Sequence, residues 1–156
     1  MAEEKTNVMR LLEQAGVRYT PHGYPHGKEH VDGVTVASIL GLDPQRVFKT
    51  LVTRGDKNGI NVFCIPVDME LDLKKAAVAS KNKKVEMTHM KELLALTGYI
   101  RGGCSPVGMK KKYPTYIDET CILFEEIAVS AGQRGVQVIL DPQDLIRYVG
   151  AAEADV

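Results

Sequence analysis

The sequence has few cysteines, no long hydrophobic run and no net charge. Cys64, Cys104 and Cys121 are widely spaced and form no CxxC pair, which argues against a zinc site or a redox dithiol. We therefore expect three reduced thiols in a cytoplasmic protein. No apolar stretch reaches the roughly 18 residues that cross a bilayer, and the first residues lack the apolar core of a signal peptide. The sequence predicts neither a membrane protein nor a secreted one.

Charge is balanced overall but unevenly distributed along the chain. There are 20 basic and 20 acidic side chains, which excludes a protein that coats nucleic acid or anionic membranes by bulk charge. Residues 70–112 carry 10 basic and 4 acidic side chains, a net charge of +6, whereas residues 113–156 carry 2 and 8, a net charge of −6. We expect any affinity for a polyanion to be weak and sensitive to salt.

The chain of 156 residues, 44% hydrophobic and 26% charged, is typical of one globular domain, here residues 1–156. Thr6, Thr88 and Asp141 are the expected N-caps of helices, Asp72 lies near the start of another, and Gly41 closes a further one. The pattern predicts helices over 7–15, 35–40, 71–79, 88–96 and from 142 to before Gly150. Strands are predicted over 47–53, 60–67, 85–87, 115–118, 127–130 and 135–140, with a start near 17–19. We expect a mixed α/β fold, with a barrel-like mixed sheet surrounded by helices.

Lys49 is the first residue that suggests chemistry. It shares one face of the predicted strand VFKTLVT with Val47 and Leu51. A lysine on a core-facing side is costly unless its ammonium group reaches a polar cleft or an anion. Either Lys49 lies at the floor of a pocket, where it could hold a phosphate or a carbonyl oxygen, or it extends to water from an edge strand.

Two glycine-rich segments are the next candidates. Residues 98–108 (GYIRGGCSPVG) hold four glycines, so their backbone could approach a ligand closely and form an oxyanion nest, or simply make a tight turn. Residues 130–135 (SAGQRG) read as a hairpin connection. Neither segment has the pattern of a P-loop or of GxGxxG. Lysines 81, 83 and 84 precede the first segment, and lysines 110–112 follow it.

Three histidines recur at a spacing of four, at His22, His26 and His30. The prolines and glycines between them make a helix implausible, so we expect a loop or irregular edge over residues 21–33 rather than a metal site. Cys104 beside Ser105 could suggest a thiol nucleophile, but no histidine can be placed beside it. A structural, partly buried cysteine is favoured.

Taken in order, VFKTLVT, LDLKKAA, KKVEM, GYIRGGCSPVGMKKKYPT and VSAGQRG resemble the YbaK/EbsC family. This family belongs to the aminoacyl-tRNA deacylases related to the editing domain of bacterial prolyl-tRNA synthetases. The resemblance covers residues 5–145 and implies a barrel-like α/β fold. It also implies hydrolysis of mischarged Cys-tRNA(Pro), with no metal or other cofactor. The partners it implies are the acceptor end of tRNA(Pro) and, as a candidate, prolyl-tRNA synthetase.

The resemblance also assigns site residues. Lys49 matches the functional lysine that contacts the terminal nucleotide and the scissile ester. The substrate-binding positions that it implies are Tyr24, Thr50, Gly102, Gly103, Ser105, Pro106 and Ser130. Two positions depart from relatives. Cys104 replaces an aliphatic residue of many relatives, and Gln137 stands where some have an acid, which weakens any acid–base role there.

No side chain of this set is a convincing general base. A cysteinyl ester carries its own thiol, which could attack the carbonyl carbon and expel the ribose hydroxyl while the enzyme positions the ester. Attack by a bound water is the alternative, and an alanyl ester would require it. Three possibilities therefore stay open from the sequence: a Cys-tRNA(Pro) deacylase, an Ala-tRNA(Pro) or broader deacylase, and a non-catalytic module that binds tRNA ends. The last would present a shallow surface instead of a pocket.

Overall fold

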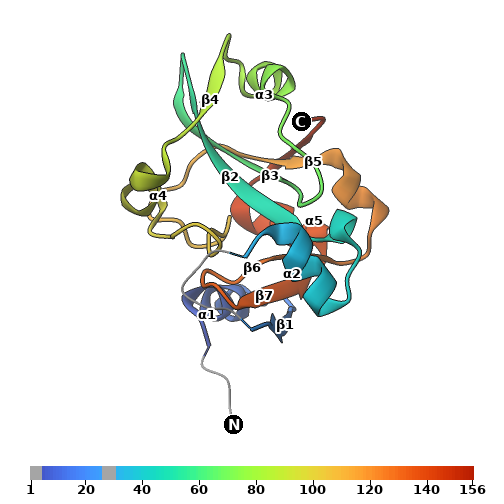
Figure 1. The fold of residues 1–156 in the computed structure, drawn as a ribbon. Helices are drawn as coiled ribbons and strands as arrows, with labels where there is room; N and C mark the ends of the chain where they lie inside the picture. Colours follow the sequence, from blue (N-terminus) through green and yellow to red (C-terminus); the bar gives the residue numbers. More distant parts are fainter. Residues whose placement is uncertain (1–4, 26–30) are drawn as a thin grey trace.

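Two β-sheets organise the chain in the computed structural model, which describes residues 5–25 and 31–156 (Figure 1). The larger sheet has the order β4-β2-β3-β5-β8. Its strands are β2 (Phe48–Gly55), β3 (Gly59–Pro66), β4 (Val85–Met87), β5 (Thr115–Asp118) and β8 (Ala152–Ala154). The smaller sheet has the order β1-β7-β6, with β1 (Thr20–Gly23), β6 (Ile127–Ser130) and β7 (Val136–Leu140). Strand β8 has no counterpart among the strands predicted from the sequence.

Both sheets are built around hairpins that the sequence predicted. β2 and β3 pair antiparallel from Phe48–Pro66 to Gly55–Gly59, and β6 and β7 pair antiparallel across the 130–135 connection. Strand β5 pairs parallel with β3, and β8 pairs parallel with β5. β1 adds an antiparallel edge to β7, so part of the segment expected to be irregular is in fact an edge strand.

A single parallel bridge, Val47 to Ala128, joins the two sheets. Beyond it β2 and β6 separate, and no ladder among the described residues closes the strands into a complete barrel. The mixed α/β fold with helices outside is confirmed, in an open form. The separation of these two strands matters because it makes room for a cavity.

In the described part of the chain five α-helices surround the sheets: α1 (Asn7–Gln14), α2 (Gly33–Leu40), α3 (Leu73–Ser80), α4 (Met90–Thr97) and α5 (Pro142–Val149). Short 3-10 turns, η1 (Pro44–Arg46) and η2 (Glu119–Leu123), join other segments. Thr6 and Asp141 cap α1 and α5 as expected, and Asp72, expected near the start of its helix, is the N-cap of α3. No helix among the described residues is long and apolar enough to cross a membrane.

The expected Thr88 cap is wrong, because α4 begins one residue later, after His89. The Glu92 carboxylate accepts the His89 N–H at 3.0 Å and so satisfies the helix start. Thr88 instead donates its hydroxyl to the Val52 carbonyl oxygen at 3.0 Å, which ties the approach to α4 to the edge of β2.

The largest core cluster lies between the smaller sheet, α1 and α5. It includes Val8 and Leu12 of α1, Val138 of β7 and Leu145 of α5, each at most 1% exposed. Figure 1 shows α1 close to the smaller sheet and α3 at the opposite end of the molecule. These buried apolar contacts fix the smaller sheet, from which one wall of the cavity is built.

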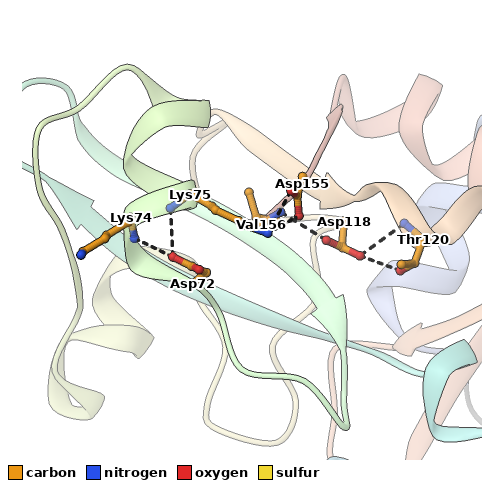
Figure 2. A network of polar contacts seen from close by, with 7 residues as sticks. All are labelled: Asp72, Lys74, Lys75, Asp118, Thr120, Asp155 and Val156. Atoms are coloured by element: carbon orange, nitrogen blue, oxygen red, sulfur yellow. Dashed lines mark hydrogen bonds and ion pairs between the residues drawn. The ribbon is translucent and has the colours of Figure 1, made fainter.

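The segment after α5 is held against the larger sheet by a polar network (Figure 2). The buried Asp118 carboxylate accepts the hydroxyl of Thr120 at 2.6 Å and the N–H of Val156 at 3.3 Å. The Val156 carbonyl oxygen accepts the Asp72 N–H at 2.9 Å, and Lys75 pairs with Asp155 at 2.9 Å. The network therefore joins β5, β8 and the start of α3.

Candidate functional site

A cavity of about 560 Å³ lies where β2 and β6 separate after the Val47–Ala128 bridge. Val47 and the β2 residues up to Val52 line one wall, and Ser130 of β6 and Gln137 of β7 line another. A second, larger hollow of about 1070 Å³ shares none of these residues; it is lined by acidic and apolar side chains near η2 and the start of α5. Of the two, only the first contains the predicted site residues.

Lys49 lines this cavity and is half-buried. Burial lowers the pKa of its ammonium group, while the charges of Glu70 and Asp68 act in the opposite direction. Among the described residues no hydrogen bond or ion pair holds its Nζ atom. β4 pairs with β2 only from Thr53 to Gly55, so the stretch of β2 that carries Lys49 has no strand partner on that side, and the lysine lines a pocket. A desolvated, unpaired cation is well suited to attract an anionic or carbonyl oxygen.

Thr50 lines the cavity beside Lys49. Its backbone N–H and C=O groups face the side of β2 that has no paired strand at this position. β4 pairs only with the far end of β2, from Thr53 to Gly55, and the Val52 carbonyl oxygen points to the same side, where it accepts the Thr88 N–H. Alternate residues of a strand direct their backbone groups to the same edge, so the N–H and C=O of Thr50 point there too. Its hydroxyl lies 3.8 Å from the Cys64 sulfur.

The glycine-rich segment contributes three lining residues, Arg101, Gly102 and Cys104. Gly102 has a φ of 88°, a conformation that favours glycine. Gly103 lies behind it, where an added Cβ atom would come within 3.2 Å of the Gln133 and Arg134 backbone. Gly103 therefore allows the 98–108 loop to pack closely on the 130–135 loop.

Ser105 and Pro106 are buried behind the wall rather than on it. The Ser105 hydroxyl oxygen accepts the Val107 N–H at 3.2 Å, and this bond shapes the turn. Gly103, Ser105 and Pro106, which the resemblance placed at the substrate, thus lie in a layer that supports the lining residues.

Tyr24, Ser130 and Gln137 come together on the wall formed by the smaller sheet. Tyr24 is 8% exposed, and its N–H bonds to the Gly135 carbonyl oxygen at 2.8 Å. Ser130 pairs with Gln137 across β6 and β7, and its hydroxyl oxygen accepts the Gly132 N–H at 3.1 Å. Five predicted residues therefore share one cavity: Tyr24, Lys49, Thr50, Gly102 and Ser130.

Cys104 lies in the wall but is unsuited to be a nucleophile. Burial raises the pKa of its thiol to about 12, so it is protonated at neutral pH, and the nucleophilic form of cysteine is the thiolate. The structure therefore agrees with a packing role for this thiol.

The mouth of the cavity includes residues that sequence reasoning did not identify. Met87, His89, Met90 and Leu93 line it from β4 and α4, and Met90 is 62% exposed. Asp32 and Val34 line it from the start of α2, and Arg101 lies beside Gly102. No local motif marks these positions, because they meet only through the packing of α2 and α4 around β2.

The lining chemistry is mainly apolar, with one half-buried cation, hydroxyl groups and free backbone groups. None of the described residues forms a cluster of three or more His, Cys, Asp or Glu side chains that could hold a metal ion. His22 lies on β1, while His26 and His30 fall outside the described residues. The arrangement can bind a small apolar group beside a polarised carbonyl or phosphate.

Comparison with known proteins agrees with this geometry. A relative named "Putative Cys-tRNA(Pro)/Cys-tRNA(Cys) deacylase EbsC", from Enterococcus faecalis, is 49% identical over 99% of this chain and 94% of its own. A structure described as "a putative trans-editing enzyme for prolyl tRNA synthetase" superposes with a TM-score of 0.81 at 25% identity, covering 97% of this chain and 98% of that one.

A third protein, the "hypothetical protein APE2540", shares the fold with a TM-score of 0.84 at 22% identity, over 96% of this chain and 97% of that one. The sequence profile described as an aminoacyl-tRNA editing domain matches residues 29–148, which include all but one of the lining residues. The chain therefore belongs to the aminoacyl-tRNA editing domain family.

Proposed function

We propose that this protein is a trans-editing deacylase that hydrolyses the ester of mischarged Cys-tRNA(Pro). The observation that carries the proposal is Lys49, a half-buried cation with no hydrogen bond or ion pair among the described residues, at a cavity of about 560 Å³. A non-catalytic module would need only a shallow surface. Family membership and the relative at 49% identity support the same activity.

In this proposal the terminal nucleotide of tRNA lies at the mouth of the cavity and the aminoacyl group lies inside. The Lys49 ammonium group donates to the ester carbonyl oxygen or to the terminal phosphate. The N–H of Thr50 and the backbone of Gly102, which both border the cavity, stabilise the oxyanion. The apolar lining accepts a small side chain such as that of cysteine.

The bond cleavage then needs no basic side chain of the protein. The substrate thiol gives up its proton and its sulfur attacks the ester carbonyl carbon, which forms a C–S bond and breaks the C–O bond to the ribose. The leaving ribose oxygen takes up a proton, and water later opens the cyclic thioester. The protein's own thiol is unsuited to this attack, because burial raises the pKa of Cys104 to about 12.

A deacylase of this kind would act where translation occurs, in the cytoplasm, with the acceptor end of tRNA(Pro) as its partner. The net charge of zero, together with the +6 segment over residues 70–112, supports weak, salt-sensitive binding of tRNA. Specificity for one tRNA would then have to come from elsewhere, and prolyl-tRNA synthetase is the candidate partner.

The deciding experiment is a deacylation panel under single-turnover conditions. Cys-tRNA(Pro), Ala-tRNA(Pro), Ser-tRNA(Pro) and Cys-tRNA(Cys) are incubated with the protein, and the remaining ester is measured with and without prolyl-tRNA synthetase. We expect rapid loss of the cysteinyl esters alone, with tRNA(Pro) favoured when the synthetase is present. Cleavage of the alanyl ester, which has no thiol, would exclude self-attack as the general mechanism. Binding of tRNA without any cleavage would identify a non-catalytic module.

A further inference from the structure

Gln137 is a buried polar residue that the proposed mechanism does not use. It lies on the central strand of the smaller sheet, is 6% exposed, and lines the cavity. Its Oε1 atom has no hydrogen-bond partner among the described residues. Leaving a buried amide oxygen unsatisfied typically costs about 1–3 kcal/mol, so this oxygen needs an explanation.

The strand register brings Gln137 into line with Lys49 across the cavity. Val47, directly before β2, bridges Ala128 of β6 in parallel, so Lys49 and Ser130 each lie two residues beyond the bridge. Ser130 in turn pairs with Gln137. All three residues line the cavity, which opens where β2 and β6 separate, so a ligand that lies beside Lys49 also approaches the Gln137 amide.

Apart from the Thr50 backbone carbonyl oxygen, the cavity has several donors but few available acceptors. Lys49 can only donate, and the Ser130 oxygen already accepts the Gly132 N–H. Asp32 is exposed at the mouth, and its carboxylate accepts both the N–H and the hydroxyl of Thr35. No hydrogen bond holds the Gln137 side chain among the described residues, so its terminal amide can turn the oxygen towards a ligand without breaking a hydrogen bond.

We infer that the Gln137 side-chain oxygen accepts a hydrogen bond from the α-ammonium group of the bound aminoacyl ester. This inference rests on the proposed function and adds a positioning role. The ammonium group is the one strong donor that every aminoacyl ester carries close to its carbonyl carbon. With the ammonium group held on the Gln137 wall, the ester carbonyl is directed towards Lys49 and the backbone of β2. A neutral amide also holds the amino group without competing with Lys49 as an ion-pair partner.

The test compares two esters that differ only in the amino group. Cysteinyl-tRNA(Pro) and chemically prepared 3-mercaptopropionyl-tRNA(Pro) both carry the thiol, but only the first has the ammonium group. Each is incubated with the wild-type protein, with Gln137→Met and with Gln137→Glu. Gln143→Met, at an exposed position on α5 outside the cavity, serves as the matched control. The ratio of kcat/KM for the two esters is divided by the ratio of their spontaneous hydrolysis rates.

For the wild type and Gln143→Met we expect this corrected ratio to favour the cysteinyl ester by about tenfold to a hundredfold, the range of a hydrogen bond to a charged group. Gln137→Met should lower kcat/KM for the cysteinyl ester by the same factor, leave the mercaptopropionyl ester unaffected, and bring the ratio to about one. Gln137→Glu, which keeps an acceptor, should retain the preference.

The inference is overturned if Gln137→Met lowers kcat/KM equally for both esters, or lowers it for neither. So does a corrected ratio near one in the wild type. If the wild type cleaves neither ester, the proposed function itself fails and the inference fails with it, which is a different result from cleavage without discrimination. Because the comparison is made within one variant, reduced folding of Gln137→Met would change both rates equally and could not imitate the expected result.

Discussion

Replacing Lys49 with methionine should change activity and stability in opposite directions. Methionine has nearly the same length and can fill the same part of the cavity wall, but it has no charge and no donor. Lys49 is half-buried, has a lowered pKa because of burial, and makes no ion pair among the described residues. The ammonium group therefore costs the folded protein free energy, and we expect it to be retained for its effect on the substrate.

The activity loss follows from removing a donor that acts on the developing oxyanion. Removal of one such donor typically lowers kcat about 10²–10³-fold, equivalent to about 2.7–4 kcal/mol. The free energy of unfolding should be unchanged or rise by at most about 1 kcal/mol, because an unpaired and partly desolvated charge is lost. For a chain of this size that would raise Tm by up to about 2–4 °C.

The lowered pKa of Lys49 also predicts how this difference in stability depends on pH. The unfolded chain binds a proton on this lysine up to its ordinary pKa of 10.5, whereas the folded chain releases it at lower pH. Wild-type stability relative to Lys49→Met should therefore rise between the folded pKa and 10.5, and the stability advantage of the variant should shrink there. Activity that depends on the ammonium group should be lost over the same alkaline range.

Single-turnover deacylation of Cys-tRNA(Pro) and thermal denaturation over pH 7–10.5 measure these effects. The control is Lys91→Met, at an exposed position on α4, which should change neither the deacylation rate nor Tm. Retained activity in Lys49→Met would remove Lys49 from the mechanism. A fall in Tm of several degrees would show that the lysine supports the fold, and the reasoning from an unpaired buried charge would be refuted.

Three further predictions test other parts of the structure. Gly103→Ala should lower kcat/KM for deacylation and destabilise the protein by about 1–3 kcal/mol, because the added Cβ atom would come within 3.2 Å of the Gln133 backbone. Unchanged kcat/KM and stability would contradict the tight packing of the two loops. Asp118→Ala should cost about 2–3 kcal/mol in urea unfolding, because its buried carboxylate accepts the Val156 N–H among other donors; a smaller cost would mean that water replaces it. All three thiols should react with a disulfide reagent at pH 8 only after denaturation, because burial raises their pKa values to about 11 or 12; rapid labelling of the native protein would argue against this burial.

Local sequence signals located most elements correctly where a short-range cause exists. The hairpin of β2 and β3, strand β4 and the caps Thr6 and Asp141 all follow from alternation, glycine positions and side chains that bond to nearby backbone. Thr88 failed as a cap because the Val52 carbonyl oxygen, distant in sequence, takes its hydroxyl. Strand β8 carries little pattern of its own, and its pairing with β5 gives it its structure.

In the candidate site, too, some features could be identified from local sequence and others could not. Lys49 and the glycine-rich segment could be identified from the sequence, because a lysine inside an apolar strand and clustered glycines are unusual wherever they occur. The methionines at the mouth, the free backbone edge at Thr50 and the unsatisfied oxygen of Gln137 could not, because each depends on which segments pack around β2.

By itself the sequence determined the class of fold and the resemblance to a deacylase family, and it predicted a single domain and a functional lysine. Tertiary structure decided that β2 and β6 pair at one bridge and then separate, that the space between them is a cavity, and that Ser105 and Pro106 support its wall without lining it. The physical reason is that side-chain patterns encode contacts between neighbours in the chain. A cavity, in contrast, forms where two strands are no longer hydrogen-bonded to each other. No local sequence pattern indicates the residue at which this pairing ends.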